Sequence, residues 1–176
     1  MAGSLEFINQ TTVSSGVTTI DVDNVFSADY DVYYCNIIGL YHNLNVSNGV
    51  EGIRFIDSGG SVISASEYDN ATLVLKADTT FQEVRNTSNS YMNMYLITDQ
   101  QSDGSSSSSF YIYNPYDSSS YTFMQYQSTG ANSSSKWGGK GIAVHKSAET
   151  IRGLQLYESN GARTFGGGQI NIYGVK

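Results

Sequence analysis

The chain has little of what secreted, catalytic and nucleic-acid-binding proteins commonly use. Its 176 residues include one cysteine, one proline and two histidines, and 14% of the residues are charged. The single cysteine, Cys35, excludes an internal disulfide, and its place in a strand-like stretch predicts a buried apolar residue rather than a reactive thiol. Nine basic against sixteen acidic residues give a net charge of −7. Because phosphate binding needs clustered Lys and Arg, we expect neither a nucleic-acid partner nor an anionic membrane partner.

Targeting segments are also scarce in this sequence. The first residues, Met-Ala-Gly-Ser-Leu-Glu-Phe, lack the basic and apolar regions of a signal peptide. No stretch approaches the roughly 20 apolar residues of a transmembrane helix. We therefore expect synthesis in a reducing cytoplasm.

The residues that are abundant predict an all-β protein. Ser, Thr, Asn and Gly favour turns and strand edges over helices, while 14 Tyr and 7 Phe favour strands. About ten strand-like segments recur at the 8–12-residue spacing that is typical of a sandwich or barrel. We predict one domain over residues 1–176, an antiparallel two-sheet sandwich with a jelly-roll-like arrangement.

The most strand-like stretch is Ala28–Leu40, which is apolar or aromatic on both faces. Alternation places Val32, Tyr34, Ile38 and Leu40 on one face, which we expect to fill the sandwich. The other face bears Tyr33, Cys35 and Ile37, which we expect to meet covering loops or a neighbouring subunit. Further along the chain, the serine-rich segment 100–109 predicts an exposed loop.

No residue pattern predicts a catalytic, cofactor or metal site. His42 and His145 lie outside the His-x-His and His-Glu-x-x-His motifs, so both are interpreted as structural or solvated. The pairs Asp21-x-Asp23 and Asp29-x-Asp31 could share a calcium ion, but capping of turns is the favoured interpretation. The sequence thus predicts no enzyme and no cofactor.

Aromatic residues in the second half of the chain are the remaining chemical signal. An aromatic platform among Ser- and Asn-rich loops can stack sugars, and such residues can equally form core edges or subunit contacts, where Tyr is enriched. We favour the second interpretation and keep the first open. The candidate residues for contact with a glycan or a partner are Trp137, Tyr116, Tyr121 and Tyr126.

Four segments resemble a group of small structural proteins of tailed bacteriophages, particularly phages of marine bacteria. These segments are Phe26-Ser-Ala-Asp-Tyr-Asp-Val-Tyr-Tyr34, Ile53-Arg-Phe-Ile-Asp-Ser-Gly-Gly-Ser-Val-Ile63, Tyr68-Asp-Asn-Ala71 and Phe165-Gly-Gly-Gly-Gln-Ile-Asn-Ile-Tyr-Gly-Val-Lys176. None of them is catalytic, so the resemblance implies no site residues.

The resemblance implies a non-enzymatic virion component, made in the cytoplasm of a bacterial host. We expect it to dock on other capsid or appendage proteins, as head decoration or as part of a fibre or knob. A homo-oligomer is expected, with a trimer favoured by analogy with other appendage sandwiches. The alternative is an adhesin tip that recognises a polysaccharide of the host surface.

Overall fold

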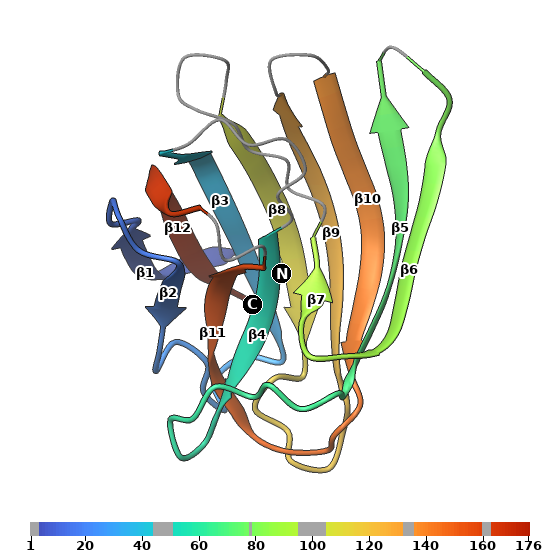
Figure 1. Cartoon of the computed structure of the whole chain (residues 1–176). Coiled ribbons are helices and arrows are strands. Elements are labelled where there is room, and N and C mark those ends of the chain that lie inside the picture. The colour runs from blue at the N-terminus through green and yellow to red at the C-terminus, as the bar shows by residue number, and fades with distance from the viewer. Residues whose placement is uncertain (1–3, 44–50, 78, 95–104, 132–135, 160–162) are drawn as a thin grey trace.

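The computed structural model describes residues 4–43, 51–77, 79–94, 105–131, 136–159 and 163–176, and the structured elements in these residues are all strands (Figure 1). In chain order the strands are β1 (Leu5–Thr12), β2 (Thr19–Val22), β3 (Val32–His42), β4 (Glu51–Asp57), β5 (Tyr68–Lys76), β6 (Gln82–Asn89), β7 (Met92–Asn93), β8 (Ser106–Tyr113), β9 (Thr122–Ala131), β10 (Lys136–His145), β11 (Ile151–Glu158) and β12 (Phe165–Val175).

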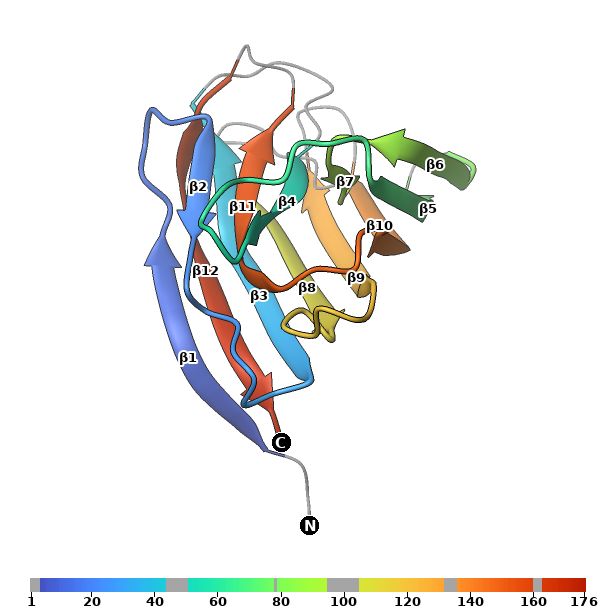
Figure 2. The same ribbon diagram turned by 90° about the horizontal axis from the view of Figure 1, so that it is seen from below.

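Two antiparallel sheets face each other as a sandwich (Figure 2). The large sheet has eight strands in the order β1-β12-β3-β8-β9-β10-β5-β6, and the small sheet has four in the order β2-β11-β4-β7. The eight strands β2 to β7, β10 and β11 can be numbered 1 to 8 in chain order. In this numbering the small sheet has the strand order 1-8-3-6. The large sheet contains strands 2, 7, 4 and 5 in that order. This is the jelly-roll arrangement, so the predicted fold class is confirmed.

Two additions widen the large sheet beyond this arrangement. The β8–β9 hairpin is inserted between β3 and β10, and β12 with β1 extends the sheet on the far side of β3. The large sheet therefore has twice as many strands as the small one.

Alternation of side chains along each strand explains why the chain folds in this way. In β9, for example, Met124 and Tyr126 are buried between the sheets, whereas Phe123 and Gln125 point away from the sandwich. The inward residues of both sheets form one hydrophobic cluster, so the core lies between the two layers.

The two faces of β3 are the reverse of those predicted from the sequence. Tyr33, Cys35 and Ile37 are buried in the core, whereas Tyr34 and Ile38 lie on the outer face. Alternation alone does not show which of two apolar faces points into the core. In this sheet the neighbouring strands determine the orientation of β3. Outward-facing Asn and Tyr residues of β12 are paired with those of β3.

A bulge at Gly39 explains why Leu40 does not share a face with Ile38. The pairing with β8 shifts between Ile37 and Leu40, so β3 contains one extra residue there. Gly39 has a φ of 63°, a left-handed conformation that glycine adopts without strain. The extra residue turns Leu40 back into the core.

The serine-rich segment does not form the predicted loop where the structure describes it. Residues 100–104 lie outside the described residues, and Ser106–Ser109 form the first half of β8 rather than a loop. Ser106 and Ser108 are buried, and the Ser108 hydroxyl donates to the carbonyl of Gln127 at 2.9 Å. A hydroxyl that finds a backbone acceptor can be buried at little cost, which composition does not reveal.

Candidate functional site

The outer face of the large sheet is the candidate functional site. Along four consecutive strands, β12, β3, β8 and β9, the side chains that point outward carry no charge. They are Gln169, Asn171, Tyr173 and Val175; Val32, Tyr34, Asn36 and Ile38; Ser107, Ser109, Tyr111 and Tyr113; and Phe123, Gln125, Gln127 and Thr129. For a chain with a net charge of −7, this surface is unusually free of carboxylates.

An aromatic row crosses this face from the edge strand inward. Register pairs align Phe7 with Tyr173, Tyr173 with Tyr34, and Tyr34 with Tyr111. Successive ring centroids are 5.7, 6.0 and 5.2 Å apart, which is within the range of favourable aromatic contact. The four residues of this aromatic row thus form a continuous strip that remains accessible.

A row of amide and hydroxyl side chains runs parallel to the aromatic row. This amide row consists of Gln10, Asn171, Asn36, Ser109 and Gln127, each paired with the next across the sheet. Gln10 Nε2 donates to Asn171 Oδ1 at 3.0 Å, and Asn171 Nδ2 donates to Asn36 Oδ1 at 2.8 Å. These two hydrogen bonds orient the amides of Gln10, Asn171 and Asn36.

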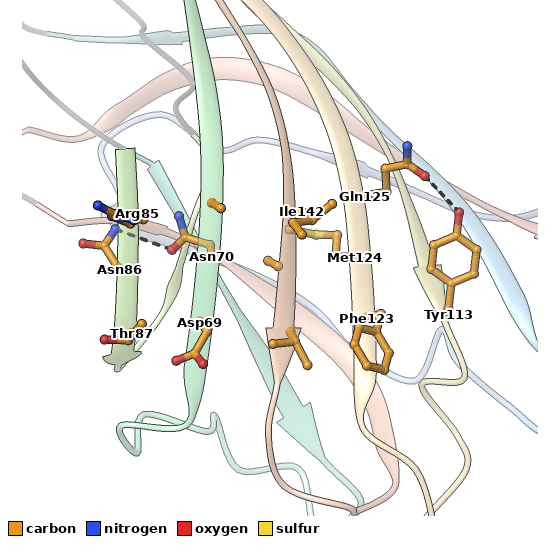
Figure 3. A pocket seen from close by; sticks show the side chains of 13 residues that line it. Asp69, Asn70, Arg85, Asn86, Thr87, Tyr113, Phe123, Met124, Gln125 and Ile142 are labelled. Atoms are coloured by element: carbon orange, nitrogen blue, oxygen red, sulfur yellow. Dashed lines mark hydrogen bonds between the residues drawn. The ribbon is translucent and has the colours of Figure 1, made fainter. Parts of the chain in front are cut away.

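Beyond the aromatic row, the outer face sinks into an apolar hollow of about 490 Å³ (Figure 3). Tyr113, Phe123 and Ile142 line it, with Ala71 on its β5 side and Arg85 on its β6 side. Ile142 is 62% exposed and Phe123 is 49% exposed. Large apolar side chains that are this accessible over several strands mark an interaction surface.

The four aromatic residues proposed from the sequence do not form one platform. Trp137 pairs with Gly130 near one end of β10, whereas Tyr121 immediately precedes Thr122, which pairs with His145 at the other end. Eight residues of strand separate these positions, or roughly 27 Å. Lys76 Nζ lies 3.8 Å from the centre of the Trp137 ring. Tyr116 lies in the β8–β9 connection, where it is exposed like Tyr121.

Tyr126 is a core residue, which corrects its proposed role in surface contact. It is 1% exposed, and its hydroxyl contacts Thr72 Oγ1 and donates to the carbonyl of Asn93 at 2.9 Å. Burial raises the pKa of this phenol to about 12. The sequence did not identify the outward-facing aromatic row as a contact surface. Alternation divides a strand into two faces, but it does not show which face the other sheet covers.

A second polar feature is a buried charge cluster between the sheets, where β3 and β11 end and β4 begins. Glu51 and Glu158 are register partners in the small sheet, which places two carboxylates side by side. Arg163 contacts both, with Nη2 at 2.9 Å from Glu158 Oε1 and 3.5 Å from Glu51 Oε1. Glu51 Oε1 also lies 3.4 Å from His42 Nε2, and all four side chains are fully buried.

Burial lowers the pKa of His42 to about 3, and the positive charge of Arg163 contributes in the same direction. The nearby Glu51 carboxylate would favour the protonated ring, but Arg163 already neutralises part of its charge. We therefore describe His42 as a neutral ring, which also stacks on Phe165 at 5.1 Å between centroids. This arrangement links both sheets and has the character of a structural cluster.

A third polar feature lies at the C-terminal end of β10, away from the end that carries Trp137. Among the described residues, one group of three His, Cys, Asp or Glu side chains is close enough to hold a metal ion, namely Glu67, His145 and Glu149. No sequence motif indicates this group, since Glu67 is 78 residues from His145. The only local signal was the spacing of four residues between His145 and Glu149.

Three of the four aspartates considered for calcium have other side-chain partners. Asp23 forms an ion pair with Arg152, in which Arg152 Nε donates to Asp23 Oδ1 at 2.8 Å. Asp21 accepts a hydrogen bond from Gln155, and Asp29 accepts one from Ser27. These contacts agree with the interpretation of the aspartates as structural.

In the described part of the chain, no helix has the length and hydropathy needed to cross a membrane. Comparison with protein-family models, with curated proteins and with solved structures finds no match to this chain. Its function must therefore be argued from its own residues.

Proposed function

We propose that this chain is a non-enzymatic structural component of a bacteriophage virion, made in the cytoplasm of the host and assembled with other virion proteins. The resemblance of four segments to phage structural proteins supports the virion assignment. The position in the particle, head decoration or fibre and knob, is a further part of the same proposal. The outer face of the large sheet is the surface that we assign to assembly.

The uncharged, tyrosine-rich outer face is the observation that carries this proposal. The buried centres of protein interfaces are depleted of charged residues and enriched in Tyr and Phe. The outward side chains of β12, β3, β8 and β9 combine both properties, and the apolar hollow continues this surface toward β5 and β6, where its lining includes Asp69 and Arg85. A monomer in water would leave Phe7, Phe123 and Ile142 largely exposed.

We propose that the partner on this face is another copy of the same chain. Two molecules with a charge of −7 repel each other least through the uncharged outward side chains of β12, β3, β8 and β9. The aromatic row and the apolar hollow occupy different parts of the face, so the row of one copy can pack against the hollow of the next. A contact between two different patches forms a ring where the rotation between copies closes, and the proposed trimer is one such ring.

The oligomeric state tests this proposal, measured by size-exclusion chromatography with light scattering at micromolar concentration. The wild type is expected to form a closed oligomer. Tyr111→Asp should weaken assembly by at least about tenfold, because it places a charge at the inner end of the aromatic row. Tyr116→Asp is the matched control, since Tyr111 and Tyr116 are both 41% exposed but Tyr116 lies in a turn.

An oligomer that is unaffected by Tyr111→Asp would contradict the assignment of the outer face. A wild type that is monomeric and does not bind purified phage particles would contradict the virion proposal itself. Imaging of particles that carry a label on this protein would then give its position.

A second function, glycan binding, is favoured by one specific observation. Exposed rings of the aromatic row lie beside the amide row, and ring faces next to oriented amides suit the apolar faces and hydroxyls of a sugar. Two shallow hollows of about 310 and 250 Å³ share Ser109 and Gln127 of the amide row.

A glycan array tests the second function. Tyr34→Ala should reduce binding at least about tenfold if sugars stack on the row, because loss of one well-placed aromatic contact is worth more than 1 kcal/mol. Trp137→Ala probes the site proposed from the sequence. The absence of any wild-type signal on glycans of bacterial surfaces would remove this function.

A further inference from the structure

We propose that Glu67, His145 and Glu149 bind a divalent transition-metal ion of the Zn²⁺ type. His145 Nε2 lies 3.3 Å from Glu67 Oε2 and 3.7 Å from Glu149 Oε1. The ligand atoms of all three residues are within 4.8 Å of one another. Two ligands bound tetrahedrally to zinc at about 2.1 Å are separated by about 3.4 Å, so one ion can reach all three.

The topology of the large sheet brings these residues together. His145 ends β10 and is the register partner of Tyr68, which begins β5. Glu67 therefore lies directly beside the end of β10, and the Lys146 amide donates to the Glu67 carbonyl at 2.8 Å. Glu149 comes from the connection between β10 and β11, which leads from the large sheet to the small one.

The histidine is held in place before any ion binds. Its side chain is 0% exposed, and its ring packs against Tyr68 and Phe55 with centroids 4.9 and 6.0 Å apart. Nδ1 has no hydrogen-bond partner within the described residues. Nε2 faces the two carboxylates and donates to Glu67 Oε2 at 3.3 Å, so a bound ion would replace this hydrogen bond while the ring proton moves to Nδ1.

The charges around the site favour a cation. Two carboxylates approach one imidazole, and the neighbouring Lys146 is directed elsewhere, with Nζ 2.8 Å from Asp69 Oδ1. A bound divalent ion would neutralise the two carboxylates. It would also connect the start of β5, the end of β10 and the connection between β10 and β11.

The ligand set selects the class of ion. Imidazole nitrogen together with carboxylate oxygen suits Zn²⁺ and similar ions, whereas Ca²⁺ and Mg²⁺ prefer oxygen ligands alone. The side chains of Glu67 and Glu149 are 39% and 34% exposed, which leaves a solvent side for a water ligand and for exchange. We assign the ion a stabilising role as a clip between the two sheets.

Isothermal titration of the tag-free protein with ZnCl₂ tests the proposal, together with the visible absorption of the Co²⁺-loaded protein. We expect saturable binding of one ion per chain and a rise in melting temperature that EDTA reverses. Glu67→Gln and Glu149→Gln should each weaken Zn²⁺ binding by at least about tenfold, because each removes a charged ligand. These side chains are partly exposed, so both variants should fold.

Glu83→Gln is the matched control, because Glu83 is an exposed glutamate on β6. This variant should bind Zn²⁺ like the wild type. Weak, non-saturable binding by the wild type would overturn the proposal. Unchanged affinity in the Glu67→Gln, Glu149→Gln double variant would also overturn it, since the ion would then be bound elsewhere. Neither result bears on assembly through the outer face.

Discussion

Replacement of Arg163 by methionine should lower the free energy of unfolding by about 3–5 kcal/mol at neutral pH. Arg163 lies between Glu51 and Glu158, and all three side chains are fully buried. Removal of the guanidinium leaves two adjacent carboxylates in a medium that solvates charge poorly. The lost stability therefore comes mainly from two buried carboxylates that have no compensating charge. The attraction between Arg163 and the carboxylates in the wild type contributes less.

Chemical denaturation of the wild type and Arg163→Met measures this loss, and Arg152→Met provides the control. Arg152 also binds an aspartate through two nitrogens, but both partners, Arg152 and Asp23, are about 30% exposed. An exposed pair of this kind contributes up to about 1 kcal/mol. Equal losses in the two variants would show that burial does not govern the energy of the Arg163 cluster.

Acidification should weaken the fold through His42. The pKa of this ring is near 6.5 in the unfolded chain and about 3 in the folded protein. Between these values the unfolded chain binds one more proton than the native protein, so the unfolding free energy falls as the pH is lowered. At about 1.4 kcal/mol per pH unit, the loss from this residue reaches roughly 2–3 kcal/mol at pH 4.5.

Unfolding curves of the wild type and His42→Gln at pH 7 and pH 4.5 isolate this contribution. Other carboxylates titrate in both proteins, so the difference between the two pH dependences reports on His42. Glutamine keeps a donor near Glu51 but cannot take up the proton. We expect the wild type to lose more stability than the variant over this interval. Parallel losses would mean that the ring can be protonated without unfolding.

Much of the fold could be predicted from composition and alternation. Few charges, many Tyr and Phe residues and regular spacing of strand-like segments indicated an antiparallel sandwich. The prediction assigned the two faces of Ala28–Leu40 the wrong way round, because both are rich in apolar or aromatic residues. The decision depends on pairs such as Tyr34 with Tyr173 and Asn36 with Asn171, which lie far apart in sequence.

The candidate sites were harder to predict for the same physical reason. The aromatic row is assembled from one residue on each of four strands, and only Tyr111 belongs to the aromatic-rich segment 111–137 that contains Trp137 and Tyr116. The metal-binding group likewise depends on the pairing of β5 with β10. Sites built across a sheet are defined by register, which a single sequence does not contain.

The pairing of β1 with β12 also determines where the chain can be extended. Leu5 is aligned with Val175, and the Lys176 amide donates to the Ser4 carbonyl at 3.0 Å, so both ends of the described chain leave the same corner (Figure 2). Phe7 and Tyr173, at the outer end of the aromatic row, lie only a few residues from this corner. A label or fused domain at either terminus would therefore sit beside the face that we assign to assembly. A fusion protein should therefore carry a linker long enough to keep the fused domain away from this face. In an oligomer assembled through this face, the fused domains of the different copies would lie close together.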